Sequence, residues 1–140
     1  MNILSVYEDV KAALADISAY DAVKENAKHP DVWIKDGATF PVISLVFSTG
    51  NFEHETGNAL WSEAHKTRVE FEIHLIITES DDNLSREFLG QFADIQSAIM
   101  TLTEESSFNE KARIYLADVQ VAIAETGAWL WAVMRLVAGE

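Results

Sequence analysis

Alternating apolar and polar residues between Lys66 and Thr78 predict a long β-strand. The residues at every second position are apolar, and those between them are mostly charged or polar; the apolar set is Val69, Phe71, Ile73, Leu75 and Ile77. A period of two is typical of a strand with one buried face and one wet face. A wet second face favours an antiparallel sheet, because parallel sheets are normally covered on both sides. We therefore expect helices to cover one face of this sheet.

Two segments repeat apolar residues at helical spacing, and each predicts an amphipathic helix. The first extends from Ile3 to about Ser18, and the second extends from Leu84 to about Thr103. Polar and acidic residues at 80–83 precede the second segment and suit a helix N-terminus, where the helix dipole favours negative charge. These two helices are the expected cover for the apolar face.

The first half of the chain contains two further predicted strands. The apolar run Val32–Ile34 indicates a brief strand, and Pro41–Phe47 indicates a longer one with the proline at its start, where a missing N–H is tolerated. Because the turn signal Asp36-Gly37 lies between them, we expect the two strands to form a hairpin. Residues 48–65 are mostly polar and are expected to form a long connection, of a kind that is often functional.

The C-terminal part predicts two strands, Ala112–Ala124 and Ala128–Val137, joined by a tight turn. The apolar phase of the first strand shifts near Ala117-Asp118, which predicts a β-bulge. Both faces of the last strand are apolar, and Arg135 is its only charge. We therefore expect both faces to be covered, the second one either within the chain or by another subunit. The tryptophans of this strand are assigned to a core or a subunit interface rather than to a ligand pocket.

The sequence thus predicts one α+β domain over residues 1–140. The expected fold is an antiparallel, strongly twisted sheet of four to five strands with two helices packed on one face, in the order α-β-β-β-α-β-β. Cysteine is absent, which excludes disulfides, thiolate metal ligands and cysteine nucleophiles. No signal-peptide pattern opens the chain, and no apolar run reaches the roughly 20 residues of a membrane helix. We therefore expect a soluble protein without a membrane partner.

Acidic residues outnumber basic residues by 23 to 10, and the formal net charge is −13. A field of this sign repels phosphate backbones, so we do not expect specific nucleic-acid binding. The same charge suits a channel through which DNA passes without sticking. It equally suits a surface that serves only solubility, or contact with a basic protein partner.

No arrangement of residues indicates catalysis, a cofactor or a metal site. The nearest approach to a metal cluster, His54 and His65 with neighbouring glutamates, is interpreted as a solvated loop. Glu70 and Glu72 share a strand face that suits an acid–base pair, but a solvated sheet face is the simpler interpretation, with His74 as a surface residue near Glu72. The sequence also lacks a nucleophile elbow and a phosphate-binding glycine loop. We expect a protein that is not an enzyme and has no cofactor.

The order and sizes of these elements resemble the tail terminator and tail completion proteins of long-tailed bacteriophages and related prophages. The resemblance is carried by the helix at Ile3–Leu14, the strand at Phe40–Phe47, the strand at Arg68–Thr78 with the helix through Phe88–Ile95, and the closing hairpin. It covers nearly the whole chain.

This resemblance implies a homo-oligomeric ring, commonly a hexamer, that caps the tail tube and joins it to the head connector. The implied partners are copies of the chain, the tail tube protein and the head connector or neck protein. The implied location is the virion tail, and the host cytoplasm during assembly. No active site is implied. For the subunit interface we select large apolar residues from the long connection and the last strand: Phe52, Trp61, Leu130, Met134 and Leu136.

Two other classes of function remain open. An acidic inhibitor or immunity-type protein that covers a basic enzyme predicts a compact monomer whose binding weakens steeply with salt. A small α+β enzyme or ligand-binding domain predicts a polar cluster in a pocket between the sheet and the helices. A ring-sized particle in solution distinguishes the assembly hypothesis from both.

Overall fold

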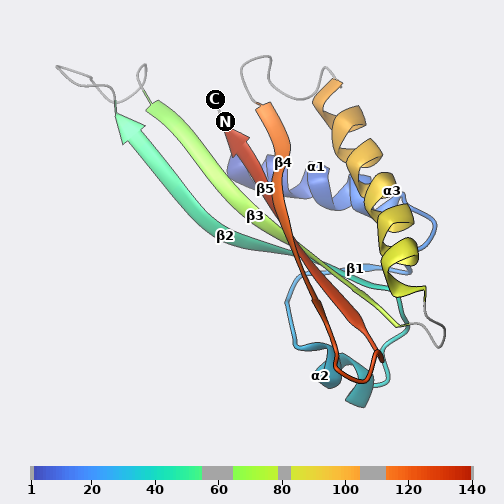
Figure 1. Ribbon diagram of the computed structural model, residues 1–140. Coiled ribbons are helices and arrows are strands. Elements are labelled where there is room, and N and C mark those ends of the chain that lie inside the picture. Colours follow the sequence, from blue (N-terminus) through green and yellow to red (C-terminus); the bar gives the residue numbers. More distant parts are fainter. Residues whose placement is uncertain (1, 55–64, 79–82, 105–112, 140) are drawn as a thin grey trace.

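A computed structural model describes residues 2–54, 65–78, 83–104 and 113–139. Its elements, in chain order, are α1 (Ile3–Ala15), β1 (Val23–Lys24), α2 (Pro30–Lys35), β2 (Val42–His54), β3 (His65–Ile77), α3 (Leu84–Glu104), β4 (Arg113–Ile123) and β5 (Leu130–Gly139). The chain has a mixed α+β fold with an open, twisted sheet (Figure 1). The predicted fold class is therefore confirmed, with a third, short helix that the sequence did not indicate.

The five strands of the sheet follow the order β1-β2-β3-β5-β4. Three of the four pairings are antiparallel, and the two-residue strand β1 pairs parallel to β2. The register of β4 against β5 shifts between Leu116 and Asp118, so the predicted bulge is confirmed. The predicted tight turn between these strands is also present, with Gly127 at a φ of 72° that suits glycine.

The expected strand at Val32–Ile34 is wrong, because these residues belong to α2. Pro30 occupies the first turn of this helix, where its fixed φ and missing N–H are favourable, and the His29 side chain caps the helix by accepting from the Asp31 N–H at 3.1 Å. The expected hairpin around Gly37 is wrong for the same reason. The outer neighbour of β2 is instead β1, which pairs with its first residues.

The expected connection at residues 48–65 is shorter than predicted. Strand β2 continues to His54 and β3 begins at His65, and the pairing between them continues through Asn51 with Arg68 and His54 with His65. Polar residues extend this ladder because each strand supplies backbone partners to the other. The two strand ends project beyond β4 and β5 as a two-stranded arm (Figure 1). Residues 55–64 lie outside the described part of the chain.

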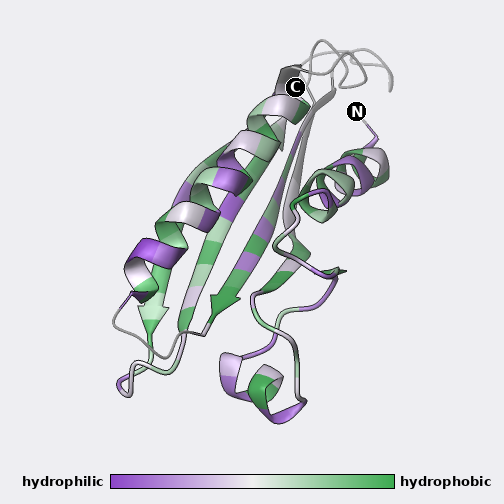
Figure 2. Cartoon of the chain, turned by 90° about the vertical axis from the view of Figure 1, so that its right-hand side faces the viewer, coloured by the Kyte–Doolittle hydropathy of each residue, from purple (hydrophilic) through white to green (hydrophobic). Residues whose placement is uncertain are grey.

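The main core lies between the sheet and the helices α1 and α3. The apolar face of β3 is fully buried there, as its alternating pattern predicted, against Val10 and Leu14 of α1 and Ile95 and Ile99 of α3. Hydrophobic and hydrophilic bands alternate along the strands (Figure 2). Both predicted helices therefore cover the predicted face of the sheet.

A second, smaller cluster lies on the other face of the sheet, beneath α2. It contains Trp33 of α2 with Val42 and Ile76, whose side chains point away from the main core because strand residues alternate between faces. Trp129 and Trp131 pack against it as partly buried residues. The second face of β5 is therefore covered at one end from within the chain, and α2 supplies the cover.

Two tyrosines connect helix α1 and the segment after it to the rest of the domain. The Tyr7 hydroxyl donates to Glu25 Oε1 at 3.1 Å and to the Leu45 carbonyl at 3.3 Å. The buried Tyr20 hydroxyl donates to Gln91 Oε1 at 2.9 Å. Burial, followed by the neighbouring Glu25 carboxylate, raises the pKa of Tyr7 to about 12, and burial raises the pKa of Tyr20 further. Both phenols are therefore held in the neutral form.

We expect these tyrosines to make the fold sensitive to alkaline pH. An unfolded tyrosine ionises at about pH 10, whereas folded Tyr7 ionises at about 12. Since the folded pKa is raised, the stabilisation is complete below about pH 10 and is lost as the pH rises through about 12. Urea unfolding across this window should show a smaller loss of stability for Tyr7→Phe than for the wild type. Tyr115→Phe, which alters a phenol that is 48% exposed, is the control. If the free energy of unfolding fell equally with pH in all three proteins, the alkaline sensitivity would not come from Tyr7.

Candidate functional site

The surface of greatest interest is the sheet face opposite α1 and α3, beyond the part that α2 covers. We call it the open face. Its residues follow from the strand alternation and the registers, and they come from β3, β5 and β4: Arg68, Glu70, Glu72, Val133, Arg135, Val137, Tyr115, Asp118 and Gln120. It contains the charged residues of β3 that the sequence pattern placed on a wet face.

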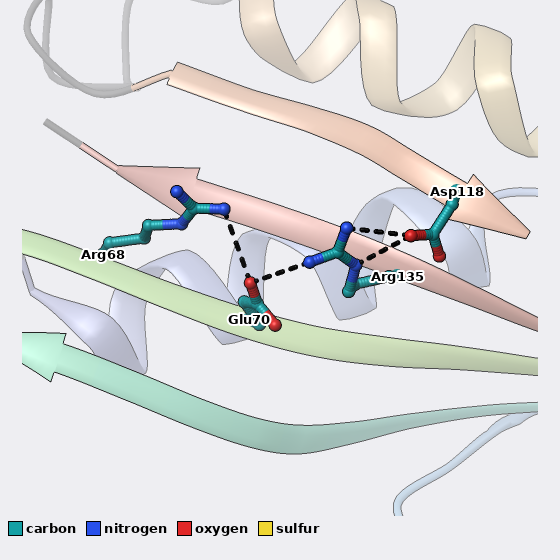
Figure 3. Close-up of polar contacts among 4 residues, drawn as sticks. All are labelled: Arg68, Glu70, Asp118 and Arg135. Carbon is teal, nitrogen blue, oxygen red and sulfur yellow. Dashed lines mark hydrogen bonds and ion pairs between the residues drawn. The ribbon is translucent and has the colours of Figure 1, made fainter.

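Four charged side chains cross the open face in one network (Figure 3). The Arg135 guanidinium donates to Asp118 Oδ2 from Nη2 at 2.8 Å and from Nε at 3.0 Å, and its Nη1 donates to Glu70 Oε1 at 3.2 Å. Arg68 Nη2 reaches the same Glu70 oxygen at 3.5 Å. Hydrogen bonding to Asp118, and then the charge of Asp118, raise the pKa of Arg135 above its ordinary value. The network joins β4, β5 and β3.

The β4 bulge places Asp118 in this network. Without the shift after Leu116, strand alternation would direct Asp118 to the helix-bearing face, but the register pairs it with Arg135. The network contains two positive and two negative side chains, so it is internally neutral within a chain of net charge −13. Glu70 accepts from Arg68 and from Arg135, and both guanidinium groups reach the same oxygen, Oε1. The Glu70 side chain is therefore part of a contact between β3 and β5.

We expect the Glu70 contacts to contribute little to stability and to depend on salt. Glu70→Gln should lower the free energy of unfolding by at most about 1 kcal/mol at low ionic strength, because partly exposed ion pairs are screened by solvent. The difference from the wild type should shrink at about 1 M salt, where the Debye length falls to about 3 Å. Urea unfolding of both proteins at the two salt concentrations measures this. A deficit of the same size at both concentrations would indicate lost packing instead.

His74 lies between the open face and the cluster beneath α2, and it is buried rather than on the surface as the sequence suggested. It is 7% exposed, because α2 and Trp131 cover the adjacent sheet. Its Nδ1 accepts from the Trp131 Nε1–H at 3.0 Å, and its Nε2 lies 3.2 Å from Glu72 Oε1. Since the indole can only donate, Nδ1 carries the lone pair and Nε2 carries the proton. The expected proximity to Glu72 is confirmed.

Helix α2 is held on the sheet by aromatic contacts. The His29 ring packs edge-on against Trp129 and Trp131, with ring centroids 5.3 and 5.5 Å apart. The Trp129 Nε1–H donates to Asp31 Oδ1 at 3.1 Å. The tryptophans of β5 therefore act as partly buried packing residues, in line with the sequence interpretation.

Three of the predicted interface residues are wrong, because they lie in the core of a single chain. Leu130, Met134 and Leu136 are 1%, 0% and 0% exposed and pack beneath the helices. They share the helix-bearing face of β5, whereas Val133 and Arg135 lie on the open face. Both faces of this strand are apolar, so the sequence pattern did not distinguish them. The side chain of Phe52, the whole of Trp61 and the side chains of the His54 and His65 cluster lie outside the described part.

The two free edges of the sheet were not predicted from the sequence. Within the described residues, β4 pairs only with β5, and β1 covers β2 only at Ile43 and Ser44. Large apolar side chains are exposed beside both edges: Phe47 on β2 is 55% exposed, and Val121 and Ile123 on β4 are 45% and 51% exposed. An alternating strand pattern indicates which face is buried, but it carries no information on which strands end the sheet.

Other features of the described residues offer less for binding. A hollow of about 300 Å³ lies between α1 and α3 and is lined by Asp9, Asp16 and Thr101 among aliphatic residues. No group of three or more His, Asp or Glu side chains within the described ranges is placed to hold a metal ion. None of the helices described is long and apolar enough to cross a membrane.

The sequence matches no protein-family model and no curated protein.

Proposed function

We propose that this protein is a structural subunit that assembles with copies of itself into a ring of the tail terminator or tail completion type. The ring caps a tail tube and joins it to the head connector. The observation that carries the proposal is the one-sided architecture of the sheet: α1 and α3 cover one face, and the other face is partly open. Among the described residues, β4 has no outer strand partner, and β2 has one only at Ile43 and Ser44. Free edges and open sheet faces are surfaces that assembly can bury.

The arm formed by the ends of β2 and β3 adds support. An isolated two-stranded ribbon is marginally stable in water, because it has too few neighbours to bury its side chains. The arm extends beyond β4 and β5, away from the main core (Figure 1). Such a ribbon gains stability when a neighbouring molecule packs against it. The arm is therefore suited to contacts with the next subunit or with the tube.

The charge distribution also supports a ring around DNA. The open-face network is neutral in itself, so the acidic surplus of the chain lies outside this network. A lining of carboxylates repels the phosphate backbone and lets a duplex slide without binding. We propose that DNA passes through the ring and is not held by it.

Solution mass tests this proposal. Size exclusion with light scattering, at low and high salt and over a wide range of protein concentration, should show a particle near the mass of six subunits. Negative-stain images of that particle should show a central hole. A strict monomer under all conditions would overturn ring formation. If that monomer also bound a basic enzyme with an affinity that fell steeply with salt, the inhibitor class would replace the present proposal.

A further inference from the structure

We propose that copies of this chain join edge to edge, with the free edge of β4 in one copy pairing antiparallel with the free edge of β2 in the next. This inference rests on the proposed ring and names its subunit contact. The proposed contact uses two strand edges of the same sheet, one on each side of the sheet.

The β4 edge is unprotected along the stretch Val119–Ile123. After the bulge, each of these residues pairs in regular register with β5 on the inner side. The stretch contains no charge and no proline, and Val121 and Ile123 are about half exposed. Folded proteins usually protect a free edge with charges, prolines or bulges, since an open row of N–H and C=O groups invites another strand. An edge without these features is suited to strand addition.

The β2 edge, on the opposite side of the sheet, also contains a stretch without charge or proline. β1 pairs with Ile43 and Ser44, and the Leu45 carbonyl accepts from the Tyr7 hydroxyl. Beyond these residues, the strand continues from Val46 to Phe52 without a charged residue. Phe47 is 55% exposed beside this edge. The bulge after Phe47 lies within this stretch and bends the strand locally.

Strand directions make the two edges compatible. Because β2–β3, β3–β5 and β5–β4 are all antiparallel, β4 runs antiparallel to β2 within one chain. Rotation of a second copy about an axis parallel to the strands leaves its strand directions unchanged. Its β2 would therefore lie antiparallel to β4 of the first copy. Phe47 and Val121 both lie on the helix-bearing face, since they pair with Phe71 and Ala132 of the core. Their exposed side chains would meet on one face of the continued sheet.

Charge favours a second copy as the occupant of each edge. Two chains of net charge −13 repel each other, and the repulsion is smallest where both surfaces are uncharged. The stretches Val119–Ile123 and Val46–Phe52 have this property. A basic partner would instead be matched by an acidic edge. Because the contact joins two different surfaces, it is heterologous, and repetition of such a contact closes into a ring when the rotation permits.

The test uses one charged substitution at each edge and a matched control. Val121→Lys and Phe47→Lys alter exposed side chains, so both variants should fold with the wild-type circular dichroism spectrum. Each should lose the ring and give a monomer in light scattering. Val32→Lys is the control, since Val32 is 43% exposed, close to the 45% of Val121, and belongs to helix α2, which contributes no strand to either edge. This control should retain the ring.

Mixing the two edge variants provides the sharper measurement. Each variant retains one intact edge, so Val121→Lys can offer β2 to the intact β4 of Phe47→Lys. The mixture should give a one-to-one dimer, which also demonstrates that both variants are folded. Pairing of β4 with β4 would instead leave Phe47→Lys able to associate alone, and this result would overturn the inference.

The remaining outcomes separate the inference from the proposed function. If the wild type forms the ring and both edge variants retain it, the edge contact is overturned and the ring proposal stands. If the wild type is a monomer at every concentration, ring formation is overturned and the edge contact with it. Capture of the β4 edge by a strand of another protein, without self-association, would likewise overturn the second copy as its occupant.

Discussion

Met134→Glu is expected to abolish folding of the domain. Met134 is 0% exposed, and on the sheet it lies between Ile73 and Val119, which face the main core. A carboxylate at this position would lose its hydration in an apolar environment, which would cost several kcal/mol in the free energy of folding. Typical domains are stable by only about 5–15 kcal/mol. Circular dichroism and urea unfolding should show loss of the cooperative transition.

Two controls show whether burial causes this loss. Met134→Leu changes shape but conserves most of the volume, so it should cost less than about 1.5 kcal/mol. Val133→Glu introduces the same charge one residue away, on the open face of β5, and this variant should still fold. If Met134→Glu folds as well as the wild type and only its oligomeric state changes, the side chain belongs to a subunit interface and the core assignment is wrong.

Phe71→Ala should cause the second largest loss of stability, about 3–5 kcal/mol in the free energy of unfolding. The Phe71 ring is 1% exposed and lies where α1 meets the centre of the sheet. Its centroid is 5.9 Å from that of Tyr7 and 6.0 Å from that of Phe47. Truncation removes these contacts and leaves a cavity that the sheet cannot close. Urea unfolding measures the change through the transition midpoint.

Phe47→Ala is the matched control for this variant. It removes the same atoms from the residue directly opposite on β2, but that ring is 55% exposed. The loss should therefore be a fraction of that for Phe71→Ala, because less apolar area leaves contact with the protein. Measurements on dissociated protein keep assembly out of the comparison. Equal losses for both variants would show that burial of the two rings is similar in solution.

Much of the fold was predictable because its signals are local. The alternation around Phe71 identified the buried face of β3, since neighbouring strand residues point to opposite faces. The phase shift near Asp118 identified the bulge, which the register confirms. Both long helices were found from apolar residues at helical spacing, and Leu84 is the first residue of α3 as predicted.

The misassigned elements share a physical cause. The three apolar residues Val32–Ile34 have no period of their own, and the proline before them is compatible with a helix start as well as a strand boundary. The polar residues 48–54 became a strand because β3 offered backbone partners, which a single segment does not reveal. His74 was placed on the surface because the cover that buries it comes from α2, far away in the sequence.

By itself, the sequence determined the α+β class, the buried face of β3, the two long helices, the bulge and the acidic balance. These follow from local periodicity and composition, which each segment carries alone. Only the tertiary structure decided which face of β5 lies in the core, how Arg135 joins Asp118 to Glu70, and which strands form the free edges. Those features depend on which distant segments become neighbours, because strand order and the sidedness of an apolar strand are set by packing among elements.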